Sequence, residues 1–154
     1  MPDPSDPFDL QRFRDAQAGV HEGALAELRR GYKTGHWIWF VFPQLAGLGH
    51  SETARYYAIA SLAEARAYLA DPLLGPRLHA CAGALLESRG TSAEAILGPV
   101  DALKLRSSMT LFLRAAPGDR VFAQVLGRFY GGVPDAATDR LLGPQRPVPS
   151  ESTG

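Results

Sequence analysis

Helix-start signals recur along this chain, and they constrain its fold more than any other feature. Asp6-Pro7 and Asp71-Pro72 each place a capping carboxylate before a proline, which the first turn of a helix tolerates because its N–H has no partner there. The segments 61–64 (SLAE) and 91–94 (TSAE) have the Ser/Thr-x-x-Glu spacing of a capping box. The pattern predicts a chain of short, individually capped helices.

Apolar spacing predicts further helices at about 101–113 and 119–129, and a last one that begins near 135. Strand-like alternation is absent, and the 154 residues include no Asn for a hairpin turn. We therefore expect an all-α, single compact domain of seven or eight short helices over residues 7–143. A flexible segment 1–6 is expected before it, and a disordered, proline-rich tail at 144–154 after it.

The composition argues against several classes of function. Sixteen Lys and Arg balance sixteen Asp and Glu, so the chain lacks the basic excess that nucleic acids and anionic membranes select. The apolar run 37–42 is far shorter than the roughly 18 residues of a membrane span. One cysteine and four widely spaced histidines show no metal-ligand spacing, so we expect no metal and no cofactor. A cytoplasmic monomer or small homo-oligomer is the expectation.

Aromatic residues are concentrated between the glycines of the segment 35–51 (GHWIWFVFPQLAGLGHS). One interpretation is plain core, because each large ring buries about 150–250 Å². The other is an aromatic-walled pocket, with Gln44 as a polar group that orients a ligand. Under the second interpretation the predicted ligand-binding residues are His36, Trp37, Trp39, Phe42, Pro43, Gln44, Gly49, Ser51, Tyr57 and Ser107.

The predicted helix 101–113 carries polar residues on its apolar face. At 100° per residue, Asp101, Lys104 and Ser108 share an arc with Leu105 and Met109. A buried ammonium is costly unless it is paired, so Lys104 needs an acid, an anionic ligand or a lowered pKa, or its stem carries the charge to water. A helix cap at Asp101 and a backbone bond at Ser108 are the structural alternatives. We predict Asp101, Lys104 and Ser108 as catalytic residues.

Two long blocks, 36–44 (HWIWFVFPQ) and 103–112 (LKLRSSMTLF), with 47–49 and 57–59 between them, resemble the DUF1810 family, also called Rv1873-like. The resemblance covers about residues 8–143 and implies a compact, all-helical, Rv1873-like bundle with no established activity. A shorter pattern is similar to the NADAR domain, whose members act on ADP-ribose and related N-glycosides. It consists of Lys104, Ser107 and Met109, followed by residues 126–129 (LGRF).

Three functional hypotheses follow, and whether the chain is an enzyme stays open. In the first, the aromatic residues stack on a nucleotide-like ligand, Gln44 contacts a base edge or sugar hydroxyl, and Lys104 meets a phosphate or an anionic transition state. For N-glycoside hydrolysis, Asp101 would orient water or stabilise an oxocarbenium-like sugar. In the second, the segment 36–44 docks a partner protein without catalysis. In the third, Asp101, Lys104, Ser108 and Gln44 form an internal network that only stabilises the fold.

Overall fold

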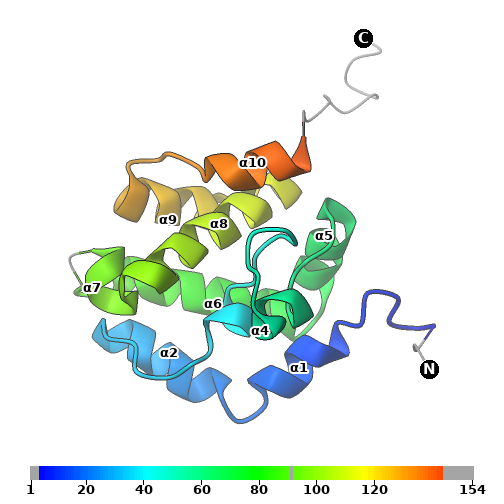
Figure 1. Ribbon diagram of the computed structural model, residues 1–154. Helices are drawn as coiled ribbons and strands as arrows, with labels where there is room; N and C mark the ends of the chain where they lie inside the picture. Colours follow the sequence, from blue (N-terminus) through cyan, green and yellow to red (C-terminus); the bar gives the residue numbers. More distant parts are fainter. Residues whose placement is uncertain (1–3, 91, 144–154) are drawn as a thin grey trace.

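The structure, a computed structural model, describes residues 4–90 and 92–143, and over these ranges it contains ten α-helices and no β-strand (Figure 1). The helices are α1 (Gln11–Gln17), α2 (His21–Arg30), α3 (Ile38–Val41), α4 (Glu52–Tyr56), α5 (Leu62–Ala70), α6 (Leu74–Glu87), α7 (Ala93–Leu97), α8 (Pro99–Ala115), α9 (Arg120–Tyr130) and α10 (Ala136–Leu142). The all-α class is confirmed. The count exceeds the expectation because α3, α4 and α7 are only four or five residues long, too short for helical periodicity to reveal.

Two of the predicted helix starts are formed as expected. Ser61 Oγ accepts a hydrogen bond from the backbone N–H of Glu64 at 3.1 Å and caps α5. Glu64 reaches back, but to the N–H of Ala60 (3.0 Å) instead of that of Ser61. Asp71 Oδ2 accepts from the N–H of Leu74 at 2.9 Å and caps the start of α6. Local hydrogen bonding therefore accounts for where these two helices begin.

Other starts and both ends of the chain differ from the expectation or lie outside the described ranges. The Asp6 carboxylate accepts two backbone N–H bonds, at 2.8 and 2.9 Å, yet α1 begins only at Gln11. The reason is Asp9, whose φ of 52° interrupts the helical turn between them. Ser92 caps α7. Thr91, the expected tail 144–154 and part of the segment 1–6 lie outside the described residues.

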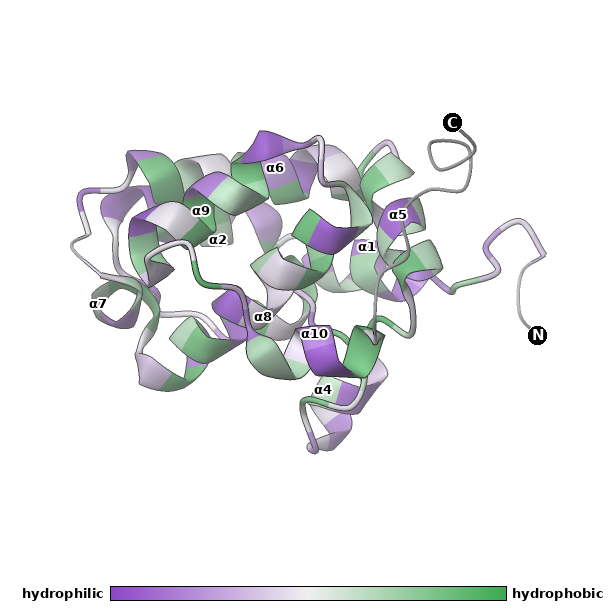
Figure 2. Ribbon diagram, turned by 90° about the horizontal axis from the view of Figure 1, so that it is seen from above, coloured by the Kyte–Doolittle hydropathy of each residue, from purple (hydrophilic) through white to green (hydrophobic). Residues whose placement is uncertain are grey.

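Helix α8 forms the centre of the fold. It packs against α5, α7, α9, α10 and α3, and Figure 1 shows it running through the middle of the molecule. Residues 107–112 are six consecutive buried positions, so this part of α8 is enclosed on every side. Figure 2 shows hydrophobic and hydrophilic residues mixed along α6 and α9, as expected of helices with one buried face. The first half of α8, which carries Asp101 and Lys104, lies nearer the surface.

The segment 35–59 lies beside the first half of α8 and contains α3 and α4. Its loop is held by a single parallel bridge, in which Ile59 N–H donates to the Gln44 carbonyl at 2.9 Å and Ala46 N–H donates to the Ile59 carbonyl at 2.8 Å. This bridge fixes the backbone on which Gln44 stands. Over the ranges that the structure describes, no helix combines the length and apolar character needed to cross a membrane.

Candidate functional site

The aromatic segment divides between core and surface. Residues two apart on a helical turn are about 200° apart, so Trp37 and Trp39 lie on opposite faces. Trp37 is 2% exposed, whereas Trp39 is half-buried. Phe42 and Pro43 are also buried. The core interpretation is therefore confirmed for Trp37, Phe42 and Pro43, while Trp39 is free to line a pocket.

Glu27 holds the turn that leads into this segment. Its Oε1 accepts hydrogen bonds from the Trp37 indole N–H at 3.0 Å and from the backbone N–H groups of Thr34 at 2.7 Å and Gly35 at 2.9 Å. Burial raises the pKa of Glu27, but these hydrogen bonds outweigh it and hold that pKa below its ordinary value. Glu27 is thus a charged anchor that orients the Trp37 ring inward.

The chain has two lysines and two tryptophans, and each lysine lies over one tryptophan. Lys33 Nζ is 5.0 Å from the Trp37 ring centroid, and Lys104 Nζ is 4.8 Å from that of Trp39. Both ammonium groups share the carboxylate of Asp101, with Lys33 Nζ at 2.9 Å and Lys104 Nζ at 3.6 Å. Asp101 is therefore no N-cap of α8; it lies in the first turn and pairs with cations. Two ammonium groups share this one carboxylate at ion-pair distance, so Asp101 neutralises the charge of one of them only in part.

That charge belongs to Lys104. The side chain of Lys33 is 8% exposed, and its ammonium also donates to the Gly35 carbonyl. Lys33 is thus held by a carboxylate, a carbonyl and the Trp37 ring. The side chain of Lys104 is 22% exposed. Its ammonium makes no hydrogen bond to any residue that the structure describes, and its only ion pair is the long one to Asp101. A third partner for Lys104 must come from solvent or from a ligand.

Lys104 and Gln44 open into one pocket, which we call the Lys104 pocket. Its volume is about 320 Å³. Within the described chain the Gln44 amide makes no hydrogen bond, although its backbone is fixed by the bridge to Ile59. Apolar side chains form most of the wall. The lining residues are Gln44, Leu48, Gly49, Val100, Leu103, Lys104, Ser107, Asp135 and Ala137.

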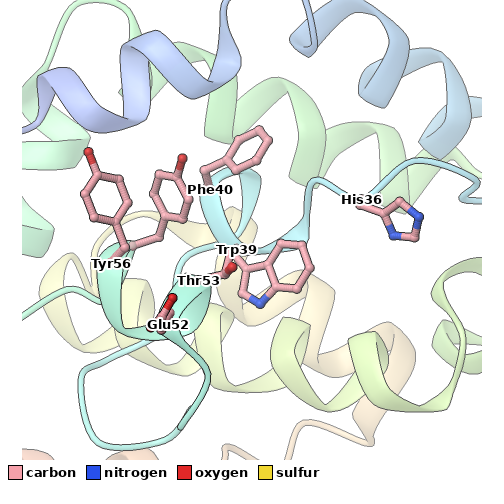
Figure 3. Close-up of a pocket in the computed structure, with 7 residues that line it drawn as sticks. His36, Trp39, Phe40, Glu52, Thr53 and Tyr56 are labelled. Atoms are coloured by element: carbon pink, nitrogen blue, oxygen red, sulfur yellow. The ribbon is translucent and has the colours of Figure 1, made fainter.

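A second pocket, which we call the aromatic pocket, lies against Trp39 (Figure 3). Its volume is about 510 Å³, and its lining residues are His36, Trp39, Phe40, Glu52, Thr53, Tyr56 and Tyr57. The rings of Phe40 and Tyr57 are 5.3 Å apart, and those of Tyr56 and Tyr57 are 4.8 Å apart. Lys104 lines one pocket and its ammonium lies over the Trp39 ring that lines the other, so this pair connects the walls of the two pockets.

Asp135 is the polar residue of the Lys104 pocket that is missing from the predicted site residues. It was expected only to begin the last helix, and it does cap α10 by accepting the Thr138 N–H at 3.0 Å. The fold also brings it against α8, where Ser107 Oγ donates to its Oδ2 at 3.0 Å. No local pattern links residues so distant in the chain. The only local feature of Asp135 was that of an aspartate that caps a helix, and this feature does not indicate a binding site.

Several predicted site residues line neither pocket. They include Ser51, whose Oγ caps α4 by accepting the Ala54 N–H at 3.1 Å. Ser108 is fully buried, and its hydroxyl has no hydrogen-bond partner among the described residues. Ser108 and Gln44 therefore take no part in the internal network that was considered as an alternative. The catalytic roles of Asp101 and Ser108 stay predictions. The residues outside both pockets are Trp37, Phe42, Pro43, Ser51, Asp101 and Ser108.

The pockets contain no arrangement of metal ligands. In the described part of the chain, no group of three or more His, Cys, Asp or Glu side chains is placed to hold a metal ion. The Lys104 pocket offers an ammonium, a carboxylate, an amide and a hydroxyl, and the aromatic pocket adds the His36 imidazole, the Glu52 carboxylate and the Thr53 hydroxyl beside its rings. These groups suit recognition of a ligand with an anionic part, hydroxyl groups and a planar ring.

Comparisons with known proteins agree on the family. Residues 7–142 match the family described as "Protein of unknown function (DUF1810)". The crystal structure of the conserved hypothetical protein Rv1873 from Mycobacterium tuberculosis is similar, with 55% sequence identity and a TM-score of 0.87. The match covers 89% of this chain and 98% of that one. No curated protein matches the chain. The family match over nearly the whole domain shows that this chain belongs to the DUF1810 family.

Proposed function

We propose that this protein binds ADP-ribose or a similar nucleotide-like N-glycoside across the Lys104 pocket and the aromatic pocket. The base stacks on Trp39 and the tyrosines of the aromatic pocket, and the phosphates contact Lys104. Gln44 supplies an amide to a base edge or a sugar hydroxyl. The observation that carries the proposal is the ammonium of Lys104, which has only the long ion pair to Asp101 among the described residues and opens into the same pocket as the Gln44 amide, which has no hydrogen bond there.

Lys104 is better suited to an external anion than to a structural role. It lies over the Trp39 ring, and Asp101 is already in closer contact with Lys33. An ammonium held by a ring and a shared carboxylate is positioned but only partly neutralised. Of the residues that resemble the NADAR pattern, Lys104 and Ser107 line this pocket, whereas Met109 is buried in the core.

Calorimetric titration of ADP-ribose into the protein and into Lys104→Ala tests the proposal. Loss of a charge-assisted contact is expected to weaken binding by about tenfold or more. Arg140→Ala is the matched control, because it removes one exposed cation that lines neither pocket. Equal affinities for the parent and Lys104→Ala, or no binding by the parent, would contradict the proposal.

The presence of only two lysines allows a second measurement on the unmodified chain. Bound ADP-ribose is expected to slow acetylation of Lys104, measured by mass spectrometry of proteolytic fragments. Lys33, which is already nearly buried, serves as the internal control. Acetylation of Lys104 at the same rate with and without saturating ligand would count against contact with the phosphates.

Product analysis decides whether binding leads to catalysis. In N-glycoside hydrolysis, the water oxygen bonds to the anomeric carbon and the carbon–nitrogen bond breaks. The proton that water loses goes to the leaving nitrogen, or to solvent where the leaving group departs neutral, as nicotinamide does from NAD. Chromatography of NAD incubated with the protein distinguishes released nicotinamide from unchanged NAD.

The alternative of a docking module using segment 36–44 has less support, because Trp37, Phe42 and Pro43 are buried and unavailable to a partner.

A further inference from the structure

We infer that Asp135 is a second ligand-binding residue of the Lys104 pocket and that it accepts hydrogen bonds from sugar hydroxyl groups. The inference rests on the proposed function and extends it. It gives the ligand an orientation, with the base in the aromatic pocket, the phosphates at Lys104 and the distal ribose beside Asp135.

The hydrogen bonds of the Asp135 carboxylate are one-sided. Oδ2 accepts from Ser107 Oγ at 3.0 Å, from Thr138 N at 3.0 Å and from Thr138 Oγ1 at 2.6 Å. Oδ1 accepts no hydrogen bond from any residue in the described ranges. A carboxylate has about four acceptor sites, two on each oxygen. In this half-buried group, Oδ2 has its hydrogen-bond donors, whereas Oδ1 has an open acceptor site among the described residues. Because Asp135 lines the pocket, the open oxygen is available to a bound molecule.

The neighbours of Asp135 favour hydroxyl groups over a second anion. A carboxylate repels phosphate, whereas it accepts strong hydrogen bonds from O–H donors. The Ser107 hydroxyl has two acceptors for its one proton, Asp135 Oδ2 at 3.0 Å and the Leu103 carbonyl at 3.2 Å, and with either one its oxygen can accept from an adjacent hydroxyl. Gln44 adds an amide that both donates and accepts. With Leu48 and Leu103 on the wall, the pocket suits the polar edge and the C–H face of a ribose.

The test compares ADP-ribose with ADP, which lacks the distal ribose, in calorimetric titrations of the parent and Asp135→Asn. Asn remains a good helix cap and keeps an oxygen for Ser107, so the fold is expected to persist. Asp135→Asn is expected not to weaken the binding of ADP, because it removes a negative charge near Lys104, which contacts the phosphates. For ADP-ribose we expect roughly ten- to hundredfold weaker binding. Asp139→Asn, one turn further along α10 and outside the Lys104 pocket, is the control and is expected to change neither affinity.

A second comparison uses only the unmodified chain. Ribose 5-phosphate is expected to compete with ADP-ribose at lower concentration than 2-deoxyribose 5-phosphate, which lacks one hydroxyl. The inference is overturned if the two sugars compete equally, or if Asp135→Asn weakens ADP and ADP-ribose by the same factor, and the proposed function then still stands. If neither ADP nor ADP-ribose binds the parent, the proposed function and this inference fall together.

Discussion

The wall of the aromatic pocket depends on Arg12, which joins three segments of the chain. Its guanidinium donates to Glu64 Oε2 at 2.7 Å on α5 and to the carbonyls of Tyr56 and Ala58, both at 2.9 Å, at the end of α4. It also donates to the Phe8 carbonyl before α1. The side chains of Arg12 and Glu64 are only 9% and 5% exposed. A further hydrogen bond goes to the Asp9 carbonyl at 2.8 Å, so Arg12→Ala leaves a buried carboxylate and four carbonyls without this donor.

The magnitude follows from burial. Removal of one partner from a buried ion pair costs about 3–5 kcal/mol, because the remaining charge stays in a poorly solvated place. For a domain of this size, each kcal/mol shifts the melting midpoint by about 2–4 °C, so a fall of roughly 6–20 °C is expected. The same chemistry near the surface is worth about 0–1 kcal/mol. Arg114 and Asp139 provide that comparison, because they pair at 2.9 Å with side chains 32% and 38% exposed.

Urea unfolding followed by far-ultraviolet circular dichroism at pH 7 measures both effects. Arg12→Ala is expected to lower the free energy of unfolding by several kcal/mol more than Arg114→Ala. The double variant Arg12→Ala/Glu64→Gln is expected to recover part of the loss, because it removes the stranded charge. If Arg12→Ala and Arg114→Ala differ by less than about 1 kcal/mol, burial does not set the strength of these pairs and the reasoning is refuted.

Two further predictions concern α6. Burial lowers the pKa of His79, but hydrogen bonds to the Gly75 carbonyl and the Asp119 carboxylate outweigh it, so this pKa lies above its ordinary value of 6.5. The stabilisation is complete below pH 6.5 and is lost as the pH rises through the folded-state pKa. His79→Gln is thus expected to destabilise the protein more at pH 6 than at pH 9 in urea unfolding, and an equal loss would contradict the pairing. A Cβ on Gly75 would lie 2.1 Å from the Leu69 carbonyl oxygen, so Gly75→Ala is expected to cost about 1–3 kcal/mol. Gly83→Ala, whose Cβ meets nothing within 4 Å, is expected to add about 0.5–1 kcal/mol in the same assay, and a gain of stability by Gly75→Ala as well would show that the contact at Gly75 relaxes.

The candidate site was only partly predictable. Lys104 was recognised because a charge on an apolar helix face is visible in local spacing. Trp37 and Trp39 were grouped together, because nothing local distinguishes the inward from the outward ring. Ser108 was placed beside Lys104 by the same helical arc, yet it is enclosed by the neighbouring helices and lines neither pocket.

Aspartates near helix starts show where local reasoning ends. Asp71 caps its helix, as its position before a proline predicts. Asp101 and Asp119 also lie near helix starts, but they pair with Lys33, which lies in the loop after α2, and with His79 of α6. Asp71 also forms a long-range ion pair, because its Oδ1 accepts from Arg14 of α1 while its Oδ2 accepts the backbone N–H groups. The ion pair that each aspartate forms depends on which cation the packing brings near, and that information is not local.

The amino-acid sequence by itself determined the helical class, the starts of several helices, such as α5, and the unusual lysine of α8. These properties depend on hydrogen bonds and periodicities within a few residues, which any stretch of chain carries with it. Only the tertiary structure decided that Gln44, Lys104 and Asp135 share one pocket and that Lys104 is the cation left without a full partner. Those relations arise when α8, α10 and the loop before α4 pack together, because contacts between distant segments are selected by the packing of the whole core and not by any one segment.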